Sequence, residues 1–257
     1  MVEQTTLITG ASSGIGLELA KVFAQHGHPV VLVARSTEKL EQLARELRFN
    51  SNVRAEVIAV DLIRPGAPDQ IIEALRRRNL TVDILVNNAG FGERGPYAEL
   101  DMRRQLDMIQ VNITAVAHLT RLVLPGMIQR NTGGILNVAS TAAFQAGPNM
   151  AMYYATKAFV LSFTEALHEE VSGTHLRVTC LCPGPTQTGF FANAHMKGVN
   201  LFKMGAQSAG AVAQVGYAAF DRNQAIVISG LKNKIAAFTT RLAPRAITRK
   251  IAMMLNA

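Results

Sequence analysis

Seven short runs of β-branched and other apolar residues recur along the chain, with segments of helical character between them. The runs are residues 5–9, 29–34, 55–60, 82–87, 133–140, 176–182 and 225–229. Short apolar runs of this kind are typical of strands buried on both faces of a parallel sheet. Their alternation with helices predicts an α/β protein: a doubly wound, seven-stranded parallel sheet with helices on both faces.

The segments between the runs carry helix signals of their own. Residues 16–27 end in a glycine, residues 37–48 hold oppositely charged pairs at helical spacing, and residues 114–130 continue the pattern. No linker, repeat or low-complexity block divides the 257 residues, a length that one domain can hold. We therefore expect a single domain over residues 1–230. A basic amphipathic tail, residues 231–257, should pack on that domain or at an interface.

Composition narrows the class further. Hydrophobic residues make up 49% and charged residues 17%, as in a globular chain. No stretch approaches about 18 uninterrupted apolar residues, so we expect no transmembrane helix. The N-terminus lacks the basic and long apolar regions of a signal peptide, which predicts a cytoplasmic location.

Two cysteines, Cys180 and Cys182, lie in the sixth apolar run. Strand alternation is expected to point their side chains to opposite faces, which argues against a disulfide and fits a reducing compartment. The six histidines are scattered and no zinc-like cysteine spacing occurs, so we expect no metal site.

The net charge of +8 is concentrated near the C-terminus. After Asp221 there is no acidic residue, whereas lysine and arginine contribute seven positive charges. The tail lacks the interleaved aromatic and basic residues of a nucleic-acid platform, so we expect no nucleic-acid binding. Leu231, Ile235, Phe238 and Leu242 recur at helical spacing. Packing on the protein's own body or a subunit interface is the common explanation for such a tail, and weak contact with an anionic membrane surface is the alternative.

The first predicted strand leads into a glycine-rich turn, TGASSGIG, at residues 9–16. Gly10, Gly14 and Gly16 let the backbone turn tightly and approach a pyrophosphate, which the N-terminus of the next helix attracts. A glycine pattern alone is weak evidence, but its place between a strand and a helix strengthens it. This turn predicts a dinucleotide site.

Further motifs follow in a fixed order: VDL at 60–62, NNAG at 87–90, Asn112 in VNITA, Ser140, YYATK at 153–157 and PGPTQT at 183–188. With the glycine turn, they make residues 5 to about 230 resemble the classical short-chain dehydrogenase/reductase family. The resemblance implies a Rossmann fold with NADP(H) or NAD(H) as cofactor. It implies cofactor contacts from Gly10, Ser12, Ser13, Gly14, Ile15, Gly16, Arg35, Ser36, Asp61, Leu62, Asn88, Ala89, Gly90, Tyr153, Lys157, Pro183, Gly184, Thr186 and Thr188.

The choice of cofactor depends on the end of the second strand. An acidic residue there would bind the ribose hydroxyls of NAD and repel a 2′-phosphate, but this chain has Ala34 followed by Arg35. The planar guanidinium suits a phosphate, so NADP(H) is favoured over NAD(H), with Ser36 assisting. The alternative for Arg35 is a solvated loop cation.

Two adjacent tyrosines compete for one chemical role. On a helix, Lys157 meets both Tyr153 at four residues and Tyr154 at three, so local spacing does not decide between them. In the resembled family the motif is Tyr-x-x-x-Lys with a serine thirteen residues before the tyrosine, and Ser140 lies thirteen before Tyr153. The resemblance therefore selects Tyr153 as general acid/base. A nearby lysine ammonium should lower the tyrosine pKa toward working pH.

The resemblance gives the other residues their roles. Ser140 holds the substrate oxygen, Lys157 holds the nicotinamide ribose, and Asn112 supports a water relay to Lys157. Asp61 reads the adenine amino group, and the asparagines of NNAG tie neighbouring strands together. Each also has a purely structural alternative: Asn112 or Asp61 as a helix cap, Ser140 as the start of a turn, and Tyr153 as a core aromatic.

The segment 189–205 is predicted to be a substrate lid. It is rich in phenylalanine and methionine, and with Phe144 and Met150 it indicates a pocket for an apolar carbonyl compound. We expect an NADP(H)-dependent reductase or dehydrogenase of steroid-like or ketoacyl-like substrates. Family resemblance also implies a homodimer or homotetramer. The alternative is a sensor or interaction protein that binds NADP(H) without turnover, which an intact Ser140, Tyr153 and Lys157 argue against.

Overall fold

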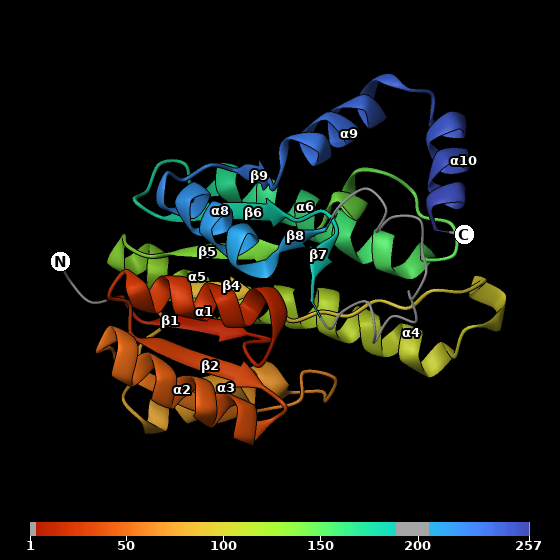
Figure 1. Cartoon of the computed structure of the whole chain (residues 1–257). Helices are drawn as coiled ribbons and strands as arrows, with labels where there is room; N and C mark the ends of the chain where they lie inside the picture. Colours follow the sequence, from red (N-terminus) through yellow and green to blue (C-terminus); the bar gives the residue numbers. More distant parts are fainter. Residues whose placement is uncertain (1–3, 189–205, 257) are drawn as a thin grey trace.

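The computed structural model describes residues 4–188 and 206–256, and a parallel seven-stranded sheet runs through its centre (Figure 1). The strand order is β3-β2-β1-β4-β5-β6-β9, and every pairing is parallel. The strands are β1 (Thr6–Thr9), β2 (Val30–Ala34), β3 (Ala55–Ala59), β4 (Ile84–Asn87), β5 (Gly134–Val138), β6 (Arg177–Cys182) and β9 (Ile226–Ile228). Each lies within one of the seven apolar runs, so the predicted α/β class and the seven-stranded sheet are confirmed.

Helices cover both faces of the sheet, and the last two helices stand at one end of the molecule (Figure 1). They are α1 (Gly14–Gln25), α2 (Thr37–Ser51), α3 (Ala67–Arg77), α4 (Met102–Ile109), α5 (Ala115–Arg130), α6 (Ala151–Glu170), α8 (Ala209–Asp221), α9 (Leu231–Leu242) and α10 (Arg245–Leu255). Short turns of 3₁₀-helix are η1 (Tyr97–Glu99) and η3 (Thr141–Phe144), and β7 (Thr186–Gln187) pairs with β8 (Gln207–Ser208).

Two apolar cores lie on opposite sides of the strands. One joins α1, α2 and α8 around Phe23, Leu40 and Phe220. The other joins α3, α5 and the end of α6 around Ile71, Leu119 and Leu167. Because the sheet is buried on both faces, its strands carry apolar side chains in both directions, which explains the continuous apolar runs.

The chain reverses its winding beside β1. Ile8 pairs with Leu32 of β2 on one side and with Val86 of β4 on the other. Helix α2, which follows β2, packs on one face of the sheet, and α5, which follows β4, packs on the other face. The two connections therefore diverge at the carboxyl ends of the strands. A crevice at this position is where open α/β sheets bind their ligands.

Helices α4 and α5 form one continuous run through a π-helical turn, η2 (Gln110–Thr114). The run 102–130 is long enough to cross a membrane, and a window of 18 residues within it reaches a mean hydropathy of 1.3. However, α5 packs on the sheet through Leu119, Val123 and Met127, and a core helix has the same composition. Packing on the sheet accounts for these apolar side chains.

The two cysteines correct one prediction. Cys180 and Cys182 are both buried and unpaired, but their sulfurs lie 3.8 Å apart on the same side of β6. Strand side chains alternate with a period of two, so residues i and i+2 share a face. The expectation of opposite faces was therefore wrong.

Helices α9 and α10 stand beyond β9 at the end of the molecule that contains α6 (Figure 1). Asn256, just after α10, is fully buried and holds the tail to this end. Its side-chain nitrogen donates to the Pro148 carbonyl at 3.0 Å, and Arg94 Nε donates to its backbone oxygen at 2.7 Å. The tail is thus fixed at its end by a polar residue.

Candidate active site

The carboxyl ends of the strands open into a cavity of about 1200 Å³. It is lined by the glycine turn, the end of β2, the NNAG segment, α6, the loop after β6 and the inner sides of α9 and α10. Of the predicted site residues, all but Gly16 and Asn112 line it. Segments more than 100 residues apart in sequence therefore meet around one space.

The glycine turn packs too closely for side chains. Gly10 and Gly14 have positive φ angles of 68° and 58°, which non-glycine residues rarely adopt. A Cβ on Gly16 would lie 2.4 Å from the Gly10 carbonyl oxygen, so Gly16 serves helix-to-turn packing and not the cavity. The turn brings the N-terminus of α1 to the cavity, and the Ser13 side chain makes no capping hydrogen bond there. These backbone amides suit a pyrophosphate.

The NNAG segment is fixed to the first strand. Asn88 Nδ2 donates to the Thr9 carbonyl at 2.9 Å, and Thr9 Oγ1 accepts from the backbone amides of Asn88 and Ala89, both at 3.0 Å. Asn87 Nδ2 donates to Asn137 Oδ1 at 2.9 Å, which joins β4 to β5. The predicted strand-tying role of the asparagine side chains is seen directly in these bonds.

The end of the cavity beside β2 and α2 carries basic side chains. Arg35 and Ser36, between β2 and α2, line it together with Lys39, one helical turn further on. Lys39 was not among the predicted residues, although it lies in the first turn of α2, close in sequence to Arg35 and Ser36. Asp61 also lines this end, and its Oδ1 accepts from the Ile63 amide at 3.1 Å, so it shapes the turn after β3 as well.

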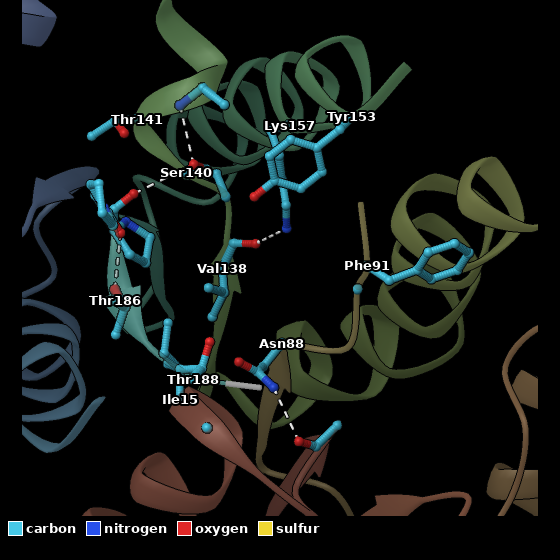
Figure 2. A pocket seen from close by; sticks show the side chains of 18 of the residues that line it. Ile15, Asn88, Phe91, Val138, Ser140, Thr141, Tyr153, Lys157, Thr186 and Thr188 are labelled. Carbon is cyan, nitrogen blue, oxygen red and sulfur yellow. Dashed lines mark hydrogen bonds between the residues drawn. The ribbon is translucent and has the colours of Figure 1, made fainter. Parts of the chain in front are cut away.

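Tyr153, Lys157 and Ser140 converge on the middle of the cavity (Figure 2). Tyr153 and Lys157 are one turn apart on α6, and the Lys157 ammonium lies 5.9 Å from the centre of the Tyr153 ring. Lys157 Nζ donates to the Val138 carbonyl at 2.8 Å, which holds it against β5. Ser140 follows β5 and hydrogen-bonds the Tyr153 hydroxyl.

Burial controls the ionisation of this pair. Desolvation raises the pKa of Tyr153 to about 12, although the hydrogen bond with Ser140 opposes the rise. Desolvation also lowers the pKa of Lys157 to about 8. In the protein chain alone the shift of the Tyr153 pKa is therefore opposite to the lowering expected from Lys157, because loss of solvation is its largest cause.

Ser140 starts a turn, as its structural alternative predicted, and it also lines the cavity. Its Oγ accepts from the Ala142 amide at 3.1 Å and lies 3.4 Å from the Pro183 carbonyl oxygen, to which it donates. It therefore caps η3 and starts a turn while its hydroxyl lines the cavity. The turn fixes the hydroxyl beside Tyr153.

Asn112 lies behind the cavity, in the π-helical turn. Its Oδ1 accepts from the Phe91 amide at 3.1 Å, and its Nδ2 donates to the Phe91 carbonyl at 2.9 Å and to Thr156 Oγ1 at 3.0 Å. It caps no helix. Gly90 separates it from Lys157: a Cβ there would lie 3.0 Å from Asn112 Oδ1 and 3.5 Å from Lys157 Nζ.

Tyr154 occupies a different environment from Tyr153. Its ring covers Gly147, where an added Cβ would lie 2.2 Å from a ring carbon. Its hydroxyl donates to Asn256 Oδ1 at 3.3 Å, and burial raises its pKa. The hydroxyl therefore connects α6 to the end of the tail, a contact that no local sequence signal indicated.

The loop after β6 forms the wall opposite α6. Thr186 Oγ1 donates to the Gly184 carbonyl at 2.9 Å, and the Thr188 side chain packs beside Gly14 of the turn (Figure 2). Phe144 instead packs with Ala139 and Cys180 and does not line the cavity, which corrects its predicted place in the substrate pocket. The predicted lid 189–205 lies outside the described residues.

A crevice that offers helix amides, a basic end and a Ser–Tyr–Lys group is typical of doubly wound oxidoreductases that use a dinucleotide. The family profile for short chain dehydrogenase matches residues 4–197. The chain therefore belongs to the short-chain dehydrogenase/reductase family, and the predicted membership is confirmed.

Related proteins include reductases named for oxoacyl and ketoacyl groups. The chain is 38% identical over 182 residues to human very-long-chain 3-oxoacyl-CoA reductase, covering 69% of this chain but only 57% of that protein. It is also 38% identical over 192 residues to a putative ketoacyl reductase of Streptomyces coelicolor, covering 74% and 73% of the two chains.

Solved structures agree in fold. A short-chain dehydrogenase from Sphingobium yanoikuyae in complex with NADPH is 33% identical, with a TM-score of 0.83 over 93% of both chains. L-Sorbose reductase from Gluconobacter frateurii, complexed with NADPH and L-sorbose, is 29% identical, with a TM-score of 0.77 over 89% of this chain and 96% of that one.

Proposed function

We propose that the protein is an NADP(H)-dependent oxidoreductase that interconverts an apolar ketone or aldehyde and its alcohol. The observation that carries the proposal is the convergence of Ser140, Tyr153 and Lys157 in the same cavity as the N-terminus of α1. Relatives that reduce ketoacyl groups, and NADPH-bound structural neighbours, support the class of reaction and the cofactor.

The cavity fits an extended dinucleotide. The amides at the start of α1 would receive the pyrophosphate, and Arg35, Ser36 and Lys39 would receive a 2′-phosphate. Asp61 and Leu62 would bound the adenine, while Lys157, with the loop 183–188, would hold the nicotinamide end. When bound, NADP(H) supplies or accepts the hydride.

The proton is handled by the chain's own side chains. A pKa of about 12 keeps Tyr153 protonated at neutral pH, as a general acid in the reductive direction requires. Ser140 donates a hydrogen bond to the substrate oxygen and steadies the charge that develops on it. In the oxidative direction Tyr153 accepts the proton, and the Lys157 ammonium stabilises the phenolate. Asn112 acts at a distance by fixing Phe91 and the backbone next to Gly90.

An apolar substrate suits the region beyond Tyr153. Met150, Ile251 and Leu255 line the cavity there, with the ring of Tyr154. We infer a ketone or aldehyde with a long or bulky apolar part. Assembly into a dimer or tetramer through α5 and α6 is part of the proposal, because Leu122 and Ile128 of α5 are exposed.

The decisive experiment compares two neighbouring tyrosines. Tyr153→Phe removes the proton donor and should lower kcat/KM for NADPH-dependent ketone reduction about 100-fold or more, since general acid catalysis contributes that much. Tyr154→Phe, the matched control, should retain most of the turnover. NADPH binding, followed by fluorescence, should persist in both variants and so verify folding. A broad panel of ketones, aldehydes and alcohols without any Tyr153-dependent turnover would favour the sensor alternative.

Cofactor choice has a test of its own. Arg35→Ser should raise KM for NADPH by about tenfold or more, because a charge-assisted phosphate contact is lost, and should leave KM for NADH nearly unchanged. Arg45→Ser, at an exposed position of α2, is the control. Equal KM changes for the two cofactors would contradict a 2′-phosphate contact at Arg35.

A further inference from the structure

Helix α9 presents its apolar side to solvent. Leu231, Ile235, Phe238 and Leu242 are between 56% and 73% exposed. Ideal helical spacing places these four side chains within an arc of about 60°. The opposite side of α9 carries small and polar residues, and Asn233, Ala237 and Thr240 line the cavity. The helix is therefore inverted relative to a core helix, whose apolar stripe would face the protein.

Helix α10, the next helix after α9, also exposes an apolar side. Ile247, Ile251 and Met254 are exposed and share one side of the helix. The side that faces the protein holds the fully buried Ala252. We call the seven outward residues of the two helices the apolar plateau; it consists of Leu231, Ile235, Phe238, Leu242, Ile247, Ile251 and Met254. Exposed apolar surface of this extent marks an interaction site.

Charge decides what kind of partner fits the plateau. Lys232 borders the α9 stripe on one side, with Lys234 and Arg241 on the other, and Lys250 borders the α10 stripe. No acidic residue occurs anywhere in residues 222–257. A symmetric contact with a second copy would set these cations against one another, which is unfavourable. An apolar stripe bordered by cations on both sides instead matches an anionic lipid surface.

The plateau and the cavity share the same two helices. The inner side of α9 lines the cavity, and so do Thr248, Ile251 and Leu255 of α10. Ile251 belongs to both surfaces, so it marks a place where the cavity meets the plateau. Asn256 fixes the end of α10 to Tyr154 and Pro148 and so keeps this wall beside the catalytic helix. Both helices are visible at this end of the molecule in Figure 1.

We propose that the apolar plateau docks on an anionic membrane surface, so that an apolar carbonyl substrate enters the cavity from the lipid between α9 and α10. Docking places the seven apolar side chains among the acyl chains and the bordering cations among the headgroups. The route of substrate entry rests on the proposed function, whereas docking itself does not.

Docking is tested by co-sedimentation of the full chain with vesicles. The protein should bind vesicles of equimolar phosphatidylglycerol and phosphatidylcholine, bind pure phosphatidylcholine weakly, and detach as salt is raised. Lys234→Gln/Arg241→Gln should weaken binding about 30-fold, since each cation contributes about a fivefold gain at an anionic surface. The control, Arg45→Gln/Arg76→Gln, removes two exposed cations of α2 and α3 and should bind like the wild type.

The apolar contribution has a matched pair of variants. Phe238→Ser/Leu242→Ser should weaken vesicle binding at least about tenfold, because two large side chains no longer enter the lipid. Phe49→Ser/Met102→Ser removes two large apolar side chains that are exposed elsewhere, Phe49 being 90% exposed, and should have no effect. Equal loss in both pairs, or equal binding of wild type to neutral and anionic vesicles, would overturn docking through the plateau. So would a dimer in analytical ultracentrifugation that Phe238→Ser/Leu242→Ser dissolves while vesicle binding is unchanged.

Substrate entry is tested separately by activity. A long-chain ketone presented in anionic vesicles should show a KM at least about tenfold higher for Phe238→Ser/Leu242→Ser than for wild type, while kcat/KM for a short water-soluble ketone stays equal. Equal KM values for the vesicle substrate would overturn entry from the lipid. Absence of turnover with every ketone, with vesicle binding intact, would refute the proposed function and leave docking established.

Discussion

Replacing Asn256 with alanine should release α10 from the catalytic helix. The change removes the acceptor for the Tyr154 hydroxyl, at 3.3 Å, and the donor to the Pro148 carbonyl, at 3.0 Å. Each buried polar group left without a partner costs about 1–3 kcal/mol. Gln145 also hydrogen-bonds the Tyr154 hydroxyl, so the loss of the Asn256 acceptor should cost the Tyr154 hydroxyl an amount in the lower part of the range of about 1–3 kcal/mol. We expect a total of about 2 to 3 kcal/mol.

That free energy should appear as local opening. Besides Asn256 itself, Ala252 is the only buried residue among the described positions of α10 and its cap. The Arg94 contact with the backbone oxygen of residue 256 remains in the variant, so the loss of the two side-chain hydrogen bonds should loosen α10 without unfolding the domain. Amide hydrogen exchange over residues 245–256 should accelerate about 30- to 150-fold, the equivalent of 2 to 3 kcal/mol, while the amides of β5 keep their rates. Asn50→Ala, at an exposed position of α2, is the control and should change neither region.

A double-mutant cycle assigns the effect to the hydrogen bond. Tyr154→Phe and Asn256→Ala should show a coupling free energy of about 1 kcal/mol, because both remove the same contact. Unchanged exchange in residues 245–256 of Asn256→Ala would refute the reasoning. Equal acceleration in β5 would refute it too, since the helix would then open only with the whole domain.

Two further predictions concern the same end of the molecule. Gly147→Ala places a Cβ against the Tyr154 ring and should lower the free energy of unfolding by about 1–3 kcal/mol in chemical denaturation, whereas Gly173→Ala, in open space, should change it by less than about 0.5 kcal/mol. Burial lowers the pKa of Lys157 from 10.5 to about 8. Between pH 8 and pH 10.5 the unfolded chain therefore binds more protons than the folded protein. The contribution of Lys157 to the free energy of unfolding should fall as the pH drops from 10.5 toward 8. Lys157→Met should lack this slope in denaturation curves measured across that window, and an identical slope in the variant would contradict the assignment.

Local sequence patterns predicted most of the fold. The strands lie where apolar runs indicated them, because residues buried on both faces of a sheet leave a continuous signal. The two cysteines show how the same rule was misapplied, since Cys180 and Cys182 are separated by one full period of a strand.

Contacts of the candidate site were predictable where both residues lie on one helix or strand. Contacts that depend on tertiary packing were much less predictable. Tyr153 and Lys157 share a helix, so their proximity follows from their separation of four residues. The Val138 carbonyl that holds Lys157, and the Asn256 side chain that meets Tyr154, carry no comparable signal. The raised pKa of Tyr153 also required the structure, because it depends on how many solvent contacts the surrounding elements remove.

The π-helical turn has a consequence for how the sequence can vary. A π-helical turn holds about one more residue than an α-helical turn. A single-residue deletion in Gln110–Thr114 would therefore relax the turn to an α-helix, which would keep α4 and α5 in nearly the same relative orientation but move the side chains within the turn. Asn112 would then leave Phe91, and the wall beside Lys157 would lose its support. Among related sequences, length in these five positions should therefore be constrained more tightly than the identity of their outward side chains.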